Sequence, residues 1–450
     1  MEITQFVTEA LGDASYLIVD SGVAAVVDPQ RDVRPFVAAA EAHNARIEYV
    51  FETHVHNDYL SGGRELAALG AKVVAPRDSG LQFPHVAIGD GDEMTIGGAT
   101  LRALSAPGHT YEHTAYIALD ERNAMRGAFT GGSLLMAAAG RSDLLGPDHT
   151  DKLLRLQWET AQRLRSQLPA SASIMPTHGT GSFCSSAGAR TERMGPLSVE
   201  LGRNPALASA SFATFRAIQT ASPGPIPSYY AYMAPLNREG PRVAGRPPLP
   251  TLLEPGEFAA LANHGVRIVD ARRRQDFAQA HIPGTTAIED DGSLLAYLGW
   301  LVPFNAPVAL VTYDAAQAER LTTDLFRIGY EDVRGYLPFA SWVAGNHPTG
   351  RIETVSAHEV AAAIDSGSRP VLDVRFSGEQ DDLPLTGALR RPIDRLPEWI
   401  DNAPDNALVV CASGYRSSAA ASILQASGRH VSAFINGGAA DVLQARTLIA

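Results

Sequence analysis

The chain has 450 residues, of which 45% are hydrophobic and 19% charged, and its formal net charge at pH 7 is −12. This is the composition of an ordinary globular protein, and a typical domain size of ~150 residues predicts about three domains. The negative charge and the lack of a Lys/Arg cluster argue against nucleic acids and anionic membrane surfaces as partners. Residues 1–15 lack a basic segment followed by an apolar one, and no uncharged apolar stretch reaches ~18 residues, so we expect a cytoplasmic protein.

Residues 1–240 alternate short β-branched runs with turn signals and a few helical stretches, which predicts a mixed α/β region. A helix is expected at Arg64–Leu69. The expected strands are Ala24–Asp28, Ile47–Glu52, Lys72–Ala75, Ala99–Leu104 and Thr114–Leu119.

Three segments of this region carry histidines in patterns that suit metal binding. His54, His56 and Asp58 directly follow the strand Ile47–Glu52, while His109 occurs in the sequence PGHT and His178 in PTHG. Two histidines at i and i+2 with a nearby aspartate, placed at a strand end, are a metal-ligand arrangement. Any one of them alone is more simply explained as a surface or satisfied core residue. Together they predict a metal site.

These segments resemble the metallo-β-lactamase superfamily over about residues 1–235. The resemblance also includes Gly12–Ile18, Val26–Pro29, Phe129–Gly131 and Gly140–Asp143. It implies an αββα sandwich in which His54, His56 and His109 form a three-histidine metal site. It further implies that Asp58 and His178 are ligands of a second site.

The sequence departs from the superfamily pattern at two ligand positions. Tyr59 stands where relatives have the last histidine of THxHxDH, and Gly132 stands where they have the aspartate of FTGD. Tyr59 weakens a second metal and argues against a two-metal hydrolase. The resemblance implies that the aspartate replaced by Gly132 ligates the iron of the dioxygenases or bridges the two metals of the hydrolases, so its loss affects both. A mononuclear three-histidine site with open positions remains, and it suits one divalent metal, Fe(II) by preference or Zn(II). Asp58 is then also a candidate for orienting a histidine instead of binding the metal.

The chain contains two cysteines, Cys184 and Cys411, so at most one disulfide is possible. Cys184 lies six residues after His178 and could approach the metal pocket. We favour a buried structural thiol for Cys184, the commonest role of a free cysteine.

Residues 241–250 concentrate proline and glycine and are typical of a linker. After them the chain repeats itself at a period of about 100 residues. Ile268–Arg272 (IVDAR) corresponds to Val371–Arg375 (VLDVR), and a strand at Val308–Val311 corresponds to one at Ala407–Val410. Each copy alternates strands and helices, so we expect two α/β domains with parallel sheets, at residues 251–347 and 353–450.

Cys411 begins a loop, CASGYR, between the predicted strand Ala407–Val410 and a predicted helix at Ser417–Leu424. The carboxyl end of a parallel strand is where α/β sheets bind ligands. A tight loop closing onto a helix N-terminus directs backbone N–H groups and the positive end of the helix dipole at the sulfur, and this favours the thiolate. Arg416 is expected to add a cation at the rim. The alternative is that Cys411 is a small buried apolar residue.

This loop, together with Asp373 and Arg375, resembles the rhodanese family over residues 353–450. The resemblance implies that Cys411 is the catalytic nucleophile, which carries sulfane sulfur as a persulfide. The predicted substrate-binding residues of this loop are Ser413, Gly414 and Arg416. The first copy has LVTYDA at the equivalent position and no cysteine, so we expect it to be catalytically silent, with a structural or interfacial role.

The combination resembles the persulfide dioxygenase–rhodanese fusions. It implies that a low-molecular-weight thiol persulfide is oxidised to sulfite with iron and O₂ while Cys411 transfers sulfur, with thiosulfate or sulfite as further partners. A homo-oligomer is implied by resemblance only. Two alternatives stay open: a thioester hydrolase of the glyoxalase II type fused to a rhodanese, and a metal-free N-terminal scaffold or sensor attached to an active rhodanese.

Overall fold

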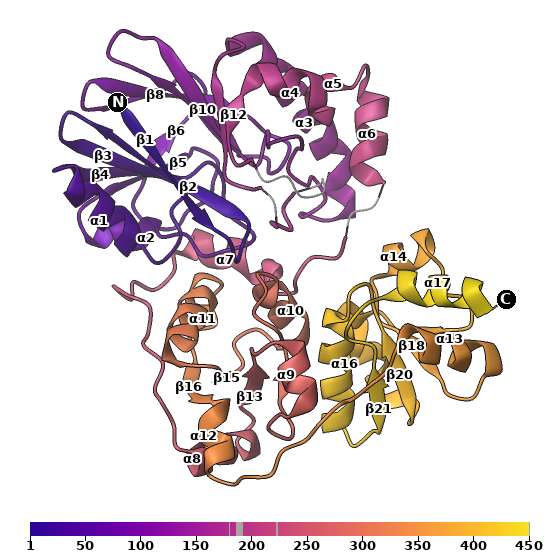
Figure 1. The fold of residues 1–450 in the computed structure, drawn as a ribbon. Helices are drawn as coiled ribbons and strands as arrows, with labels where there is room; N and C mark the ends of the chain where they lie inside the picture. Colours follow the sequence, from indigo (N-terminus) through magenta and orange to yellow (C-terminus); the bar gives the residue numbers. More distant parts are fainter. Residues whose placement is uncertain (180, 186–191, 222–223, 450) are drawn as a thin grey trace. The chain divides into compact units, whose positions relative to one another are not determined.

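The computed structural model describes residues 1–179, 181–185, 192–221 and 224–449 of the chain. These residues form two compact units. Unit 1 lies within residues 1–223, 229–247 and 326–329, and unit 2 lies within residues 224–228, 248–325 and 330–450. Figure 1 traces both units along the chain.

The first sheet of unit 1 begins with an antiparallel meander and continues with parallel strands. Its strands, hydrogen-bonded in chain order, are β1 (Glu2–Thr8), β2 (Asp13–Asp20), β3 (Val23–Val27), β4 (Arg46–Phe51), β5 (Lys72–Pro76) and β6 (Val86–Ile88). β1 to β3 are antiparallel neighbours, whereas β3 to β6 run parallel. The segment that carries His54 therefore leaves the sheet at the carboxyl end of parallel strand β4.

The second sheet of unit 1 is mostly antiparallel. Its strands are β7 (Glu93–Ile96), β8 (Ala99–Ser105), β9 (Thr114–Leu119), β10 (Met125–Gly131), β11 (Ser173–Pro176) and β12 (Gly195–Pro196), in the order β12-β11-β10-β9-β8-β7. Only the pair β10–β11 is parallel among these described strands. The candidate residues His109 and His178 lie just beyond β8 and β11.

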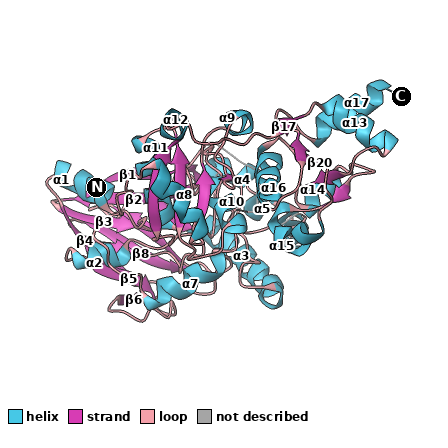
Figure 2. Cartoon of the chain, turned by 90° about the horizontal axis from the view of Figure 1, so that it is seen from below, coloured by secondary structure: helices cyan, strands magenta, loops and turns pink. Residues whose placement is uncertain are grey.

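The two sheets face each other across a shared apolar core, and helices cover their outer faces. In β3, Val27 packs between the sheets, whereas Val26 packs outward against helix α1 (Arg34–Ala42), as the two-residue period of a strand requires. Figure 2 shows α2 (Gly63–Ala68) beside β4 on this side. Helices α3 (Pro147–Gln167), α4 (Leu197–Arg203), α5 (Pro205–Ala208) and α6 (Phe212–Thr220) contribute to the core on the outer face of the second sheet. The expected αββα sandwich is confirmed.

Unit 2 contains two sheets, and each is entirely parallel in the described residues. The first has the order β14-β13-β15-β16 and the second the order β17-β21-β20-β18-β19. The elements of the first are α8 (Pro255–Asn263), β13 (Arg267–Asp270), α9 (Arg274–Gln279), β14 (Thr286–Ala287), α10 (Leu294–Leu301), β15 (Val308–Thr312), α11 (Ala315–Arg327), β16 (Val333–Pro338) and α12 (Phe339–Ala344). The elements of the second are β17 (Glu353–Thr354), α13 (Ala357–Ser366), β18 (Val371–Asp373), α14 (Ser377–Asp382), β19 (Leu389–Arg390), η1 (Ile393–Arg395), α15 (Leu396–Trp399), η2 (Ile400–Asn402), β20 (Ala407–Val410), α16 (Tyr415–Ala426), β21 (Val431–Ala433) and α17 (Ala439–Ile449).

The strand register confirms the internal repeat. Asp270 pairs with Val311 in the first sheet, and Asp373 pairs with Val410 in the second. Each aspartate also holds the arginine two residues later, with an N–O distance of 2.6 Å in both copies. Because Val311 and Val410 are equivalent, the residue that corresponds to Cys411 in the first copy is Thr312.

The two copies share part of one apolar core. Ala287 of the first copy packs in the same cluster as Cys411 and Ala419, and its backbone N–H donates to Ser422 Oγ at 3.0 Å. The first copy thus contacts α16, the helix that follows Cys411, and its structural or interfacial role stays a prediction.

The expected strands of the N-terminal region and the strands of both repeats are confirmed to within about two residues. Residues 241–250 form neither helix nor strand, although the domain boundaries themselves stay predictions. Among the described helices, none is both long and apolar enough to cross a membrane.

Candidate functional site

Histidines from three loops meet at one edge of the unit 1 sandwich. His54 and His56 follow β4, His109 and His113 lie between β8 and β9, and His178 follows β11, all with buried side chains. The ring centroid of His54 lies 4.3 Å from that of His56, 4.9 Å from those of His109 and His113, and 5.2 Å from that of His178. This cluster is the candidate metal centre.

Three of the rings are each held by an outer contact at one nitrogen. The contacts are His54 Nδ1 to Thr53 Oγ1 at 2.8 Å, His109 Nδ1 to the carbonyl oxygen of Arg141 at 2.7 Å, and His178 Nδ1 to Asp13 Oδ1 at 2.9 Å. Metal-binding histidines typically show this arrangement, because the outer partner fixes the ring and leaves the other nitrogen for the metal. That other nitrogen of His109, Nε2, has no hydrogen-bond partner.

His56 is held from the opposite ring position. Its Nε2 lies 3.3 Å from Asp28 Oδ1, 3.3 Å from Glu52 Oε2 and 3.0 Å from the hydroxyl of Tyr59. Its Nδ1 has no hydrogen-bond partner. The ring of Tyr59 stacks on that of His56 at 4.4 Å, and its hydroxyl donates to the carbonyl oxygen of Asp28. Tyr59 therefore supports His56 at the position where the superfamily pattern has a ligand.

Asp28 connects the loops that carry these histidines. Its carboxylate accepts hydrogen bonds from the backbone N–H of Thr53 at 2.7 Å, from Thr53 Oγ1 at 2.8 Å and from Thr177 Oγ1. Thr53 precedes His54, and Thr177 precedes His178. Burial alone opposes the charge of Asp28, but His56 and these donors outweigh it and lower the pKa of the carboxyl below its usual value.

The cluster separates neutral from protonated imidazoles. Burial, together with the neighbouring histidines, lowers the pKa of His54 well below its usual value and that of His109 to about 3. Burial also opposes the charge of His178, but Asp58 and Asp13 outweigh it and raise the pKa to about 10. The neutral imidazole is the form that binds a metal, and a bound cation displaces a proton where one is held.

The donor atoms fit a divalent cation. In three sets of buried residues, one ligand atom from each member lies within 4.8 Å of the others: His54, His109 and His178; His56, Asp58 and His178; and Asp28, Glu52 and His56. Imidazole with carboxylate suits iron and zinc alike. The expected residues are thus brought together, but His109 is grouped with His54 and His178 and not with His56.

The position of the missing aspartate has no room for a side chain. A Cβ on Gly132 would lie 2.3 Å from Cδ2 of His109, and a Cβ on Gly140 would lie 2.8 Å from Nδ1 of the same ring. The His109 ring therefore packs directly against two stretches of backbone. The absence of a carboxylate at position 132 is part of how His109 is held.

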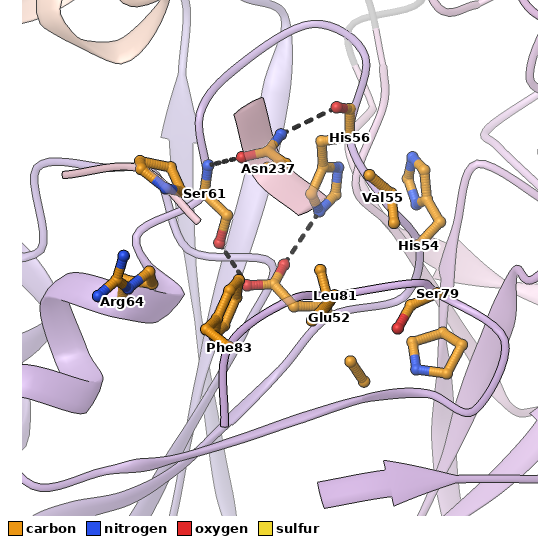
Figure 3. Close-up of a pocket in the computed structure, with 13 residues that line it drawn as sticks. Glu52, His54, Val55, His56, Ser61, Arg64, Ser79, Leu81, Phe83 and Asn237 are labelled. Carbon is orange, nitrogen blue, oxygen red and sulfur yellow. Dashed lines mark hydrogen bonds and ion pairs between the residues drawn. The ribbon is translucent and has the colours of Figure 1, made fainter. Parts of the chain in front are cut away.

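A small pocket adjoins His54 and His56 on the side of Glu52 (Figure 3). Asn237, from helix α7 (Tyr230–Glu239), reaches across it. The side-chain amide of Asn237 donates to the carbonyl oxygens of His56 at 2.9 Å and Tyr59 at 2.8 Å, and its Oδ1 accepts from the N–H of Ser61 at 2.9 Å. Helix α7 thus holds the loop that carries the first two histidines.

In unit 2, Cys411 lies at the carboxyl end of β20, and its Sγ accepts a hydrogen bond from the N–H of Gly414 at 3.0 Å. Gly414 has φ +92°, and a Cβ there would lie 2.0 Å from the carbonyl oxygen of Ile435. Only glycine fits this turn, which leads directly into α16 at Tyr415. The expected strand, loop and helix around Cys411 are confirmed, while its chemical role stays a prediction.

Arg416, expected as a fixed cation at the rim of the Cys411 loop, is held in place by an acidic and an aromatic side chain. Its side chain is buried, pairs with the carboxylate of Glu379 through both terminal nitrogens, and lies 4.5 Å above the ring of Phe376. Its charge is therefore already balanced, and it fastens the loop to α14. Ser413 is exposed in the same loop, and substrate binding by these residues stays a prediction.

The equivalent loop of the first copy is closed by its own side chains. Thr312 Oγ1 donates to the carbonyl oxygen of Asp314 at 2.9 Å, and the hydroxyl of Tyr313 bonds to Asp276. No thiol is present there to accept sulfur.

Residues 6–191 match the family model of the metallo-beta-lactamase superfamily. The N-terminal part of the chain is a metallo-beta-lactamase domain.

Curated relatives of this domain are hydrolases by name. The chain is 34% identical over 161 residues to a hydroxyacylglutathione hydrolase of Methylococcus capsulatus (strain Bath), a match that covers 35% of this chain and 58% of that protein. It is 35% identical over 132 residues to the cytoplasmic hydroxyacylglutathione hydrolase of Arabidopsis thaliana, covering 28% of this chain and 51% of that protein. The chain thus spans little more than half the length of these relatives.

A solved structure extends the likeness beyond this domain. The crystal structure of a metallo-beta-lactamase from Staphylococcus aureus subsp. aureus COL superposes with a TM-score of 0.67 at 26% identity, covering 75% of this chain and 98% of that one. Unit 1 holds little more than half of the chain. The similarity in fold therefore continues into unit 2.

Sequence reasoning missed several residues of the metallo-beta-lactamase domain that shape the site. His113 accepts a hydrogen bond from the N–H of Gly132 at 2.9 Å and stacks on His54. Its only signal is its place four residues after His109. The sequence places Glu52 at the end of a predicted strand. Its contact with His56 depends on how the end of that strand lies against the loop, which the sequence does not indicate.

Cys184 lies near two carboxylates of the candidate metal centre, those of Asp58 and Asp13. It is buried, and Asp58, Asp13 and Tyr230 are the groups that influence its thiol. Burial first, and then the charges of Asp58 and Asp13, raise its pKa well above the usual value. A buried thiol that keeps its proton fits the structural role favoured from the sequence, which stays a prediction.

The packing of His109 yields a testable expectation. We expect Gly132→Asp, which restores the superfamily sequence, to lower the free energy of unfolding by about 1–3 kcal/mol, because the new side chain must displace the His109 ring. We also expect it to reduce the bound metal. Calorimetry and metal analysis of the purified chain measure both effects.

The matched control is Gly202→Asp, at an exposed position of α4 where a Cβ meets no other atom. It is expected to change stability by no more than about 1 kcal/mol. A Gly132→Asp protein as stable as the parent, with two metals per chain, contradicts the steric argument.

Proposed function

We propose that the protein is a sulfur-handling enzyme in which the metallo-beta-lactamase domain oxidises a low-molecular-weight thiol persulfide and Cys411 transfers sulfane sulfur. The proposal is carried by one combination: a buried histidine cluster with donors for a metal ion stands in the same chain as a cysteine at the N-terminus of a buried helix. The sequence resemblance to persulfide dioxygenase–rhodanese fusions supports it.

The overall oxidation is balanced as RSSH + O₂ + H₂O → RSH + SO₃²⁻ + 2H⁺. Fe(II) held by the histidines supplies the redox chemistry with O₂ that zinc lacks. The protein contributes imidazoles whose rings are fixed by outer hydrogen bonds.

In the transfer step, the Cys411 thiolate attacks the outer sulfur of RSSH. The Sγ–S bond forms, the bond between the two persulfide sulfurs breaks, and RS⁻ leaves. Sulfite then attacks the terminal sulfur of the Cys411 persulfide, which gives thiosulfate and returns the thiolate. The Gly414 N–H, already bonded to Sγ, and the N-terminus of α16 stabilise the negative charge on sulfur throughout.

Thioester hydrolysis is the second candidate, and the names of the curated relatives favour it. In that reaction the centre activates water against a glutathione thioester. A bridged pair of metals serves such hydrolysis, and Tyr59 and Gly132 stand where two of its ligands are expected. We therefore rank it below persulfide oxidation.

The full chain purified from cells separates these reactions. We expect about one iron per chain and O₂ uptake when glutathione persulfide is added, because the cluster retains histidine donors for one ion. Metal analysis, an oxygen electrode and hydrolysis of a hydroxyacylglutathione thioester are the measurements. Two zinc ions with thioester hydrolysis and no O₂ uptake would instead establish the hydrolase, and a chain isolated without metal that does neither is a scaffold.

Cys411 is tested independently of the metal. We expect Cys411→Ser to abolish sulfur transfer from thiosulfate or persulfide to an acceptor, at least 100-fold below the parent, while O₂ uptake is unchanged. Serine cannot form the persulfide but fits the same space.

The control for that experiment is Thr312→Ser at the equivalent position of the first copy, where the hydroxyl that bonds Asp314 is retained. It should leave both activities unchanged. Sulfur transfer that survives in Cys411→Ser removes Cys411 from the mechanism.

A further inference from the structure

We propose that the centre holds a single metal ion on His54, His109 and His178, so that His178 takes the place of the carboxylate missing at position 132. This differs from the grouping expected from sequence, in which His178 belongs to a second metal and His56 to the first. It rests on the proposed metal centre but not on which reaction that centre performs.

The spacing of two imidazoles supports a shared ion. His54 Nε2 and His178 Nε2 lie 3.3 Å apart. Two nitrogens that each lie about 2.0–2.1 Å from one tetrahedral ion are separated by about 3.3–3.4 Å. His109 supplies the third donor of the same set, within 4.8 Å of both.

The outer contacts occupy Nδ1 in all three rings, so that Nε2 faces the centre; Nε2 of His54 and Nε2 of His178 are hydrogen-bonded to each other there, an interaction that a shared ion would replace. Each is held at Nδ1, by Thr53, by the carbonyl of Arg141 and by Asp13 respectively. The Nε2 atoms of all three are therefore the ones available to a metal. For His109 that atom is buried and has no hydrogen-bond partner, which costs free energy unless a ligand satisfies it.

A second set of donors, His56, Asp58 and His178, is equally close, but it shares His178 with the first set. His178 cannot offer Nδ1 to a second metal without giving up Asp13, which holds that atom at 2.9 Å. Tyr59 directs its hydroxyl to the backbone of Asp28, and position 132 has no side chain. Asp58 remains, 3.3 Å from His178 Nδ1, where it acts as an outer partner of the His178 ring.

The test uses Zn²⁺ added to the metal-free full chain, with bound ions counted and affinity measured by competition with a chelating dye. The parent chain should saturate at one ion. His178→Ala should lose at least about 100-fold in affinity, as should the positive control His54→Ala. Asp58→Asn should keep one ion, with a loss of about 10–100-fold at most, as for an outer-partner residue.

Circular dichroism and the thermal midpoint of each metal-free variant show whether it is folded. If His178→Ala does not fold, His178→Gln, which keeps most of the side-chain volume, replaces it. Two bound ions in the parent, or unchanged affinity for one ion in a folded His178 variant, overturns the proposal. Because zinc binding is the readout, a chain that binds one ion through His178 yet shows neither O₂ uptake nor thioester hydrolysis refutes the proposed function and leaves this inference intact.

Discussion

The carboxylate of Asp28 is the constraint on which the metal centre depends. It lies at the end of β3, is fully buried, and receives hydrogen bonds from Thr53 and Thr177, the residues that precede His54 and His178. Hydrogen bonds to a charged group contribute about 1.5–3 kcal/mol each, and a buried carboxylate without them is strongly destabilising. The first sheet and the second sheet are therefore joined at the one point where their histidine-bearing loops must meet.

Asp28 also holds residues that surround the histidines. Asp28 shares the Nε2 proton of His56 with Glu52, and its backbone carbonyl accepts from Ser15 Oγ at 2.6 Å and from Tyr59. Its backbone has φ +49°, a conformation that costs an L-residue about 1–2 kcal/mol, and the dense set of hydrogen bonds offsets this cost. The strain is located beside the metal centre, where precise placement of the rings is needed.

Most of the fold could be predicted from the sequence, because its signals are local. Short β-branched runs predicted the strands of unit 1. The aspartate–arginine pairs that begin at Asp270 and Asp373 predicted two equivalent strand ends, and the strand register confirms them. The Cys411 loop was equally readable, since a strand, a tight turn with Gly414 and a helix follow one another directly in the chain.

The arrangement of the site could be predicted only in part. Motifs identified His54, His56, Asp58, His109 and His178 as a set, but which nitrogen of each ring faces inward depends on partners far away in sequence. His109 is oriented by the carbonyl of Arg141, and His178 by Asp13, neither of which has a motif of its own. Arg416 illustrates the same limit: the sequence showed a cation beside Cys411, whereas the partner that balances it, Glu379, lies 37 residues away.

Gly132 changes meaning once the packing is known. In the sequence it is a lost ligand, and it suggests a decayed centre. In the structure, the ring of His109 occupies the space that a side chain at 132 would need, and His113 accepts the backbone N–H of the same glycine. This close packing fixes the position of the His109 ring, which matters for a site that uses His109 as a ligand and has no purpose in a site that has lost its metal. The glycine therefore agrees with the histidine-only centre proposed above, in which the unpartnered Nε2 of His109 would bind the metal.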